Sequence, residues 1–156
     1  MDDSPTSPID RSAPLTAKDR SGAQRAVNQL LDELAPERTI RRAERAPVPV
    51  EQYRTPNGCV LQASDTALSV SWFADSPDGG RLGELHVLVW HGIVSRRGSP
   101  SQREGASMVR EEVFHPIERS QDAGAWRGAD GRTYDNDALV AHSLAMLERE
   151  IARASG

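Results

Sequence analysis

Cysteine is almost absent from this 156-residue chain, and its scarcity excludes two kinds of structure. The single cysteine is Cys59, so the chain can form neither an intrachain disulfide nor a structural zinc site built on several thiolates. A lone thiol is typical of a reducing compartment. Because Cys59 lies in a short apolar run with Val60 and Leu61, we expect a buried, unreactive thiol and not a nucleophile.

Long apolar runs are also missing. No stretch of the sequence approaches the roughly 18 apolar residues of a membrane span, so no membrane partner is expected. Residues 1–14 have neither the positively charged start nor the apolar segment of a secretory signal, and we expect a cytoplasmic protein. Their prolines, serines and acids predict a disordered tail, which leaves residues 15–156 as a single domain.

Lysine occurs once, as Lys18, and the other eighteen of the 19 basic residues are arginines. Arginines spread this evenly are typical of a GC-rich bacterial genome. The net charge is −4, with both signs interspersed. That distribution does not give the positive field on which nucleic-acid binding depends, so no nucleic-acid partner is expected.

Sequence motifs for familiar chemistry are missing as well. The chain has no Gly-x-Ser-x-Gly nucleophile elbow and no phosphate-binding loop that ends in Gly-Lys-Ser or Gly-Lys-Thr. His86 and His91 are five residues apart on one predicted strand, so they point to opposite faces and cannot hold one metal ion without a bulge. We therefore expect neither a metal nor a cofactor, and an enzyme is not the first hypothesis.

What the chain does have is a clear succession of helix and strand patterns. Apolar residues at helical spacing predict a first helix from near Thr16 to before Pro36, and a last helix that follows Asp135 or Asn136. Segment 37–45 is interpreted as a short helix or an arginine-rich connector, and 46–50 as extended. Loops are expected at 75–81 and 95–105, and strands at 59–63, 66–74, 82–94, 106–117, and 125–127 with 132–134.

Together these elements predict an α+β fold. We expect a central antiparallel β-meander of about five strands, flanked by an N-terminal and a C-terminal amphipathic helix. If the loop 95–105 is centred near residue 100, paired positions sum to about 200 and even-numbered residues face even-numbered ones. His86 then lies opposite Phe114, and Trp90 lies opposite Arg110 in a cation–π geometry.

In this register the odd-numbered face is apolar and suits helix packing, whereas the even-numbered face mixes aromatic and ionisable side chains. Such a mixture is unusual on a plain solvent face. The even-numbered face supplies the candidate binding residues: Trp72, Glu84, His86, Trp90, Arg110, Glu112 and Phe114.

Two functional hypotheses follow from this face. The first is a non-enzymatic module that binds a protein partner or a second copy of itself, because Trp72, Trp90, Met108, Arg110 and Phe114 are of the types enriched at interfaces. The alternative is a small-ligand pocket, formed by curling of the sheet and lined by the four ionisable residues of this face. With Glu84 and Glu112 as acid and base, such a pocket could serve a hydrolase-like or isomerase-like enzyme.

Overall fold

The computed structural model describes residues 17–42, 45–74, 82–94, 106–117 and 125–155. In chain order, one helix is followed by eight strands and a second helix. These elements are α1 (Ala17–Leu34), β1 (Arg38–Arg42), β2 (Arg45–Thr55), β3 (Gly58–Ala63), β4 (Thr66–Phe73), β5 (Glu84–His91), β6 (Ser107–Pro116), β7 (Trp126–Gly128), β8 (Thr133–Tyr134) and α2 (Asn136–Ser155).

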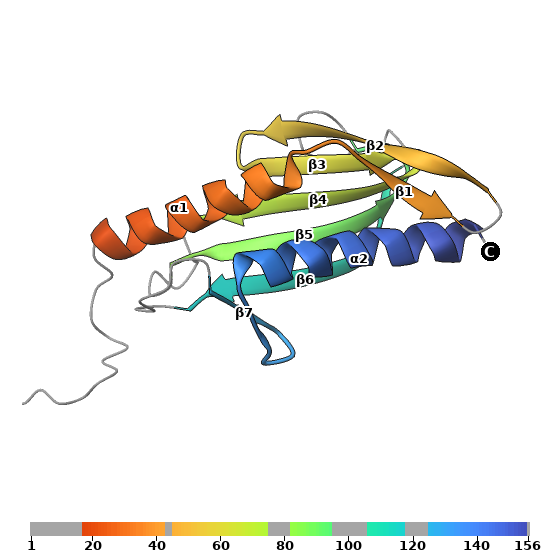
Figure 1. The fold of residues 1–156 in the computed structure, drawn as a ribbon. Helices are drawn as coiled ribbons and strands as arrows, with labels where there is room; N and C mark the ends of the chain where they lie inside the picture. Colours follow the sequence, from red (N-terminus) through yellow and green to blue (C-terminus); the bar gives the residue numbers. More distant parts are fainter. Residues whose placement is uncertain (1–16, 43–44, 75–81, 95–105, 118–124, 156) are drawn as a thin grey trace, which may run out of the picture.

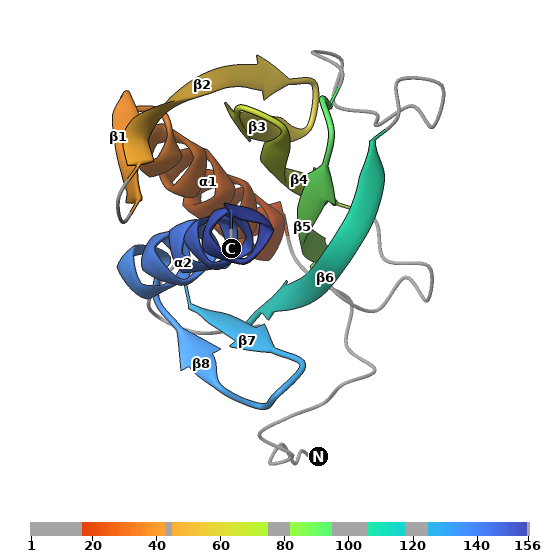
Figure 2. The same ribbon diagram turned by 90° about the vertical axis from the view of Figure 1, so that its right-hand side faces the viewer.

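The eight strands form one antiparallel sheet in which every strand lies beside its neighbours in the sequence, from β1 at one edge to β8 at the other. The sheet curls into a half-barrel (Figures 1 and 2). Both helices lie within its curve, so the concave side is filled and the convex side of β4, β5 and β6 is not covered by either helix (Figure 2). The α+β class and the antiparallel sheet are thus confirmed.

The expected meander of about five strands, with a helix on either flank, is wrong. Segment 38–42, interpreted as part of a short helix or an arginine-rich connector, is the strand β1. Residues 46–50, interpreted as extended but not as a strand of the sheet, belong to the strand β2. The prolines of β2 concealed the strand, because proline cannot donate a ladder hydrogen bond. Pro47 and Pro49 are tolerated because this half of β2 is paired on one side only: residues 45–50 pair with β1, whereas residues 51–55 pair with β3.

The other predicted elements lie where the sequence patterns placed them, with shifted bounds. The strands expected at 59–63, 66–74, 82–94 and 106–117 are β3, β4, β5 and β6, and the last hairpin is β7 and β8. Asp135 is the N-cap of α2, since its Oδ1 accepts a hydrogen bond from the Ala138 amide at 2.7 Å. The predicted tail at 1–14 and the predicted loops at 75–81 and 95–105 lie outside the described residues.

The main core lies between the concave face of the sheet and the two helices. Each helix turns one apolar stripe towards the sheet, as its spacing predicted. Among the described residues, neither helix is long and apolar enough to cross a membrane. The buried stripe of α1 consists of Ala23, Val27, Leu30, Leu31 and Leu34, and that of α2 is centred on Leu139, Leu147 and Ile151. The facing sheet residues include Leu61, Leu68, Val70, Leu85 and Val87.

One buried polar side chain ties three elements of this core together. Asn136, at the start of α2, accepts a hydrogen bond from the indole N–H of Trp126 on β7 at 2.7 Å. Its own amide group donates to the carbonyl oxygen of Ala26 on α1 at 3.0 Å. Both bonds are buried. Loss of the amide leaves the indole N–H of Trp126 without a partner and removes the bond to the Ala26 carbonyl, which keeps its hydrogen bond within α1.

Replacement of Asn136 by alanine is therefore expected to destabilise the fold. Asn136→Ala should lower the free energy of unfolding by about 2 to 4 kcal/mol, because two buried hydrogen bonds are lost. Urea denaturation followed by circular dichroism measures this change. The matched control is Asn28→Ala on the exposed side of α1, where a change within about 0.5 kcal/mol is expected. Equal losses in the two variants would show that the buried bonds contribute little.

Candidate functional site

The register between β5 and β6 decides which side chains share a face, and it changes once along the pair. Next to the segment 95–105, Trp90 pairs with Met108 and His91 with Ser107, so even faces even as expected. A bulge between Val89 and Trp90 then shifts the pairing by one residue. Beyond the bulge Val89 pairs with Arg110, and odd-numbered residues of β5 face even-numbered residues of β6.

This shift corrects the predicted even-numbered face. Trp90 and Phe114 lie on opposite sides of the sheet, and neither predicted pair, Trp90 with Arg110 or His86 with Phe114, forms. Between β4 and β5 the same odd-to-even pairing holds, with Trp72 opposite Leu85. A single inserted residue exchanges the two faces of everything that follows it, because side chains alternate along a strand.

Four of the seven predicted site residues lie on the concave side: Trp72, Arg110, Glu112 and Phe114. Trp72 is buried and packs edge-on against Trp126, with ring centroids 5.9 Å apart. Phe114 is also buried, in edge-on contact with Tyr134. These two aromatic residues belong to the core of the domain.

The two charged residues of this group join β6 to α2. Glu112 accepts a hydrogen bond from Arg110 at 2.9 Å and contacts His142 of α2 at 2.8 Å. Burial by itself raises the pKa of Glu112, but the hydrogen bonds and charges of His142 and Arg110 outweigh it and hold that pKa below its ordinary value. This cluster is a link between sheet and helix.

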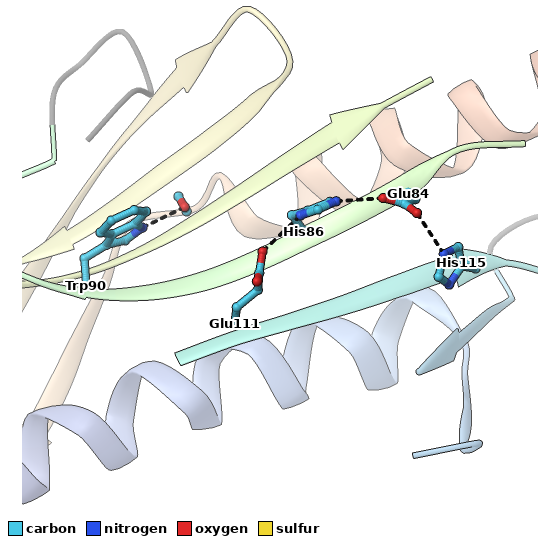
Figure 3. Close-up of polar contacts among 6 residues, drawn as sticks. Glu84, His86, Trp90, Glu111 and His115 are labelled. Atoms are coloured by element: carbon cyan, nitrogen blue, oxygen red, sulfur yellow. Dashed lines mark hydrogen bonds and ion pairs between the residues drawn. The ribbon is translucent and has the colours of Figure 1, made fainter. Parts of the chain in front are cut away.

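The other three predicted residues, Glu84, His86 and Trp90, lie on the convex side. Trp90 is nearly buried there, and its indole N–H donates to the Ser69 hydroxyl at 3.0 Å (Figure 3). It belongs to a second, smaller cluster of apolar residues, which packs on the convex side of the sheet. The cluster comprises Val60, Ala67, Trp90, Val94 and Ala106, with Tyr53 and Leu88 packed against it.

Glu84 and His86 belong to a chain of alternating acids and histidines on β5 and β6 (Figure 3). His86 Nε2 lies 3.0 Å from one oxygen of Glu84, and His86 Nδ1 lies 3.2 Å from Glu111. The other oxygen of Glu84 lies 3.3 Å from His115 Nε2. Since His86 meets a carboxylate at each ring nitrogen, only its imidazolium form can donate to both at once.

Electrostatics in this chain favour an ionised Glu84. Hydrogen bonds from His86 and His115 hold the pKa of Glu84 below its ordinary value, against a smaller opposing effect of burial. The side chains of this chain, which are those of Glu84, His86, Glu111 and His115, are 24 to 41% exposed. This half-exposed network thus places the carboxylates of Glu84 and Glu111 at the solvent-facing surface.

Three convex residues of this site escaped the sequence analysis: Glu111, His115 and Phe73. Glu111 and His115 are four residues apart on a strand, which already places them on one face, but the wrong register assigned that face to the helices. Phe73 of β4 was assigned to the apolar odd face. Its ring stands edge-on to His86 with centroids 4.9 Å apart, and it is 46% exposed.

These residues define a surface that we call the convex patch. It spans the outer side of β4, β5 and β6. Its members are Phe73, Glu84, His86, Leu88, Met108, Glu111, Val113 and His115.

Two other kinds of site can be assessed from the described residues. Across the described ranges, no group of three or more His, Cys, Asp or Glu side chains is arranged to hold a metal ion. Burial raises the pKa of the Cys59 thiol to about 11, although Arg54 and Arg38 oppose it. Cys59 is therefore a protonated, inaccessible thiol at neutral pH, as its apolar sequence context predicted.

Comparisons of this chain with family models, with curated proteins and with solved structures give no match. No function can therefore be transferred to it from a relative. The geometry of its surfaces is the basis for the proposals that follow.

The hydrogen bonds of Glu84 make a pH-dependent contribution to stability. A carboxyl whose pKa is lower in the folded chain stabilises the fold above its unfolded pKa, and this contribution is lost as the pH falls through the folded pKa. Glu84→Gln should therefore lower the free energy of unfolding at pH 7 by up to about 1 kcal/mol. The difference from wild type should disappear below the lowered pKa of Glu84.

Urea denaturation between pH 3 and pH 7 measures both parts of this prediction. Glu148→Gln, an exposed change on α2, is the matched control and should follow the wild-type curve throughout. A loss in Glu84→Gln that is as large at pH 3 as at pH 7 would show that the carboxylate charge is not its cause.

Proposed function

We propose that this chain is a non-enzymatic protein-interaction module that binds a partner protein through the convex patch. The observation that carries the proposal is a sheet face that neither helix covers and that has large exposed apolar side chains. Phe73 is 46% and Met108 49% exposed, while both helices occupy the other side of the sheet. Aromatic residues and methionine are enriched at protein interfaces, and exposed apolar patches commonly mark them.

The charge of the patch indicates the kind of partner. Glu84 and Glu111 give it negative charge at neutral pH, while Arg127 of β7, opposite His115, adds one positive charge at its margin. A partner surface with apolar side chains and arginine or lysine would complement it. A second copy is a poorer occupant, because face-to-face pairing would bring the two acidic clusters together, with only the marginal Arg127 of each copy to offset them.

The small-ligand alternative depends on a cavity shared by Glu84, His86, Arg110 and Glu112. The first two residues lie on the convex side and the last two on the concave side, where the helices fill the curve of the sheet. These four residues therefore line no common pocket, and the interaction module is the function that we propose. The lone buried thiol and the arginine-rich composition support a place in the cytoplasm of a bacterium.

Site-specific photo-crosslinking in cells of the source organism tests this proposal. A photoreactive phenylalanine analogue placed at Phe73 or Met108 should form an adduct with one and the same protein, because both positions face the bound partner. The control is the same analogue at Gln24, which is exposed on α1 on the other side of the sheet, and it should form no such adduct. Mass spectrometry identifies the captured chain.

The captured protein should then bind purified wild-type chain, and Phe73→Ser with Met108→Ser should weaken this binding about tenfold or more. Circular dichroism verifies that the double variant is folded. Adducts that join two copies of this chain, or equal capture from the Gln24 position, would contradict the proposal.

A further inference from the structure

Strand β6 has a long edge beside which no other described strand lies. On one side it pairs with β5 from Ser107 to Phe114. On the other side β7 pairs only with Phe114, His115 and Pro116. Among the described strands, none continues this pairing along residues 107–113, which we call the open edge of β6. An exposed strand edge is a template for a further strand.

The backbone groups of the open edge point in a defined direction. The amide of Ile117, just beyond β6, donates to the carbonyl of Ala125 on the β7 side at 2.9 Å. Because donors and acceptors alternate between the two edges of a strand, the N–H and C=O groups of Val113 and Glu111 point to the same side. They are thus directed away from β5, and no described strand forms hydrogen bonds with them.

A cleft of about 430 Å³ lies between this edge and the C-terminal half of α2. This volume is within the range of ligand sites, roughly 300 to 1,000 Å³. Val89, Val109 and Met146 supply apolar lining, and Val109 is 39% exposed. Figure 1 shows α2 running alongside β6, and the residues that line the cleft belong to β5, β6 and α2.

The charged lining of the cleft is predominantly positive. Three arginines line it, Arg110, Arg149 and Arg153, together with one acid, Glu150. Glu150 is already neutralised within the protein, since its carboxylate contacts both Arg153 and His91. Arg153 is engaged with Glu150, and Arg110 with Glu112 of β6. Among the described residues, Arg149 is therefore the guanidinium group of the cleft that forms no ion pair, and such a group binds carboxylates in two-pronged geometry.

We propose that an extended acidic segment of another protein binds here by adding a strand to the open edge of β6. Its backbone bonds to Glu111 and Val113, and its alternate side chains enter the cleft, where apolar residues meet Val109 and Met146 and acidic residues meet the arginines. Strand addition between an edge and a helix is a recurrent mode of peptide recognition. This surface is distinct from the convex patch, so each of the two proposals can be refuted without affecting the other.

The positive charge of the cleft favours an acidic segment over a second copy of this chain or a free anion. A second copy of this chain would bring its own Arg110, Arg149 and Arg153 to the same place, and like charges would oppose the pairing. A free anion would use the arginines alone and leave the open backbone groups unpaired. An acidic extended segment uses both features of the site.

The test uses full-length chain and a fluorescent peptide of defined sequence, Thr-Val-Thr-Glu-Thr-Glu-Thr, blocked at both ends. Fluorescence anisotropy should show saturable binding that weakens about tenfold or more when both glutamates of the peptide are replaced by lysine. Amide hydrogen exchange followed by NMR should slow at Glu111 and Val113 when the peptide is bound, since both amides become hydrogen-bonded.

Matched variants locate the charge effect. Arg149→Glu, in the cleft, should weaken binding of the peptide about tenfold, whereas Arg25→Glu, on the exposed side of α1, should leave it unchanged. Both variants change one exposed helical arginine, so a general loss of positive charge would affect them equally.

Three results would overturn the proposal. The first is equal binding of the acidic and the basic peptide. The second is binding without slower exchange at Glu111 and Val113, which would indicate a simple anion site; N-acetylglutamate would then compete for it. The third is protection of these two amides without peptide, together with a doubled mass in analytical ultracentrifugation, which would assign the edge to a second copy. Failure of any arm leaves the photo-crosslinking test of the convex patch unaffected.

Discussion

The curvature of one sheet around two helices is the constraint on which the rest of this structure depends. Because α1 and α2 both lie on the concave side, the inward positions of β3, β4 and β5 must be apolar and closely packed, as Leu61, Val70 and Val87 are. Asn136 then holds the two helices and β7 in one arrangement. The outward positions carry no such requirement, which leaves the convex side free for a second small core and for ionisable groups.

The sequence was sufficient for both helices and for the strands whose side chains alternate clearly. It was insufficient where an element breaks the usual pattern. Pro47 and Pro49 concealed β2, because only the three-dimensional arrangement leaves that half of the strand with one neighbour. The predicted register of β5 and β6 was wrong beyond the bulge beside Val89. Residues 107–113 are largely exposed on both sides of the sheet, so no apolar alternation marks the residue at which the phase changes.

The candidate site shows the same division between local and non-local information. Glu84 and His86 were identified because the predicted even-numbered face mixed aromatic and ionisable side chains. Their partners Glu111 and His115 depend on the pairing of two strands that are far apart in the sequence, which a one-residue error reverses. Trp90 was predicted to be a binding residue, but it is buried on the convex side. It is a member of the separate apolar cluster there. Residue type alone did not distinguish this tryptophan from an exposed one.

The buried thiol of Cys59 has a consequence for the study of motion in this chain. It is the sole cysteine and lies on β3 between β2 and β4, protonated and shielded from solvent. Its side chain belongs to the core between the sheet and the two helices, so a thiol reagent can modify it only after that packing opens locally. The rate of alkylation therefore measures how often the core between sheet and helices opens, without any engineered label.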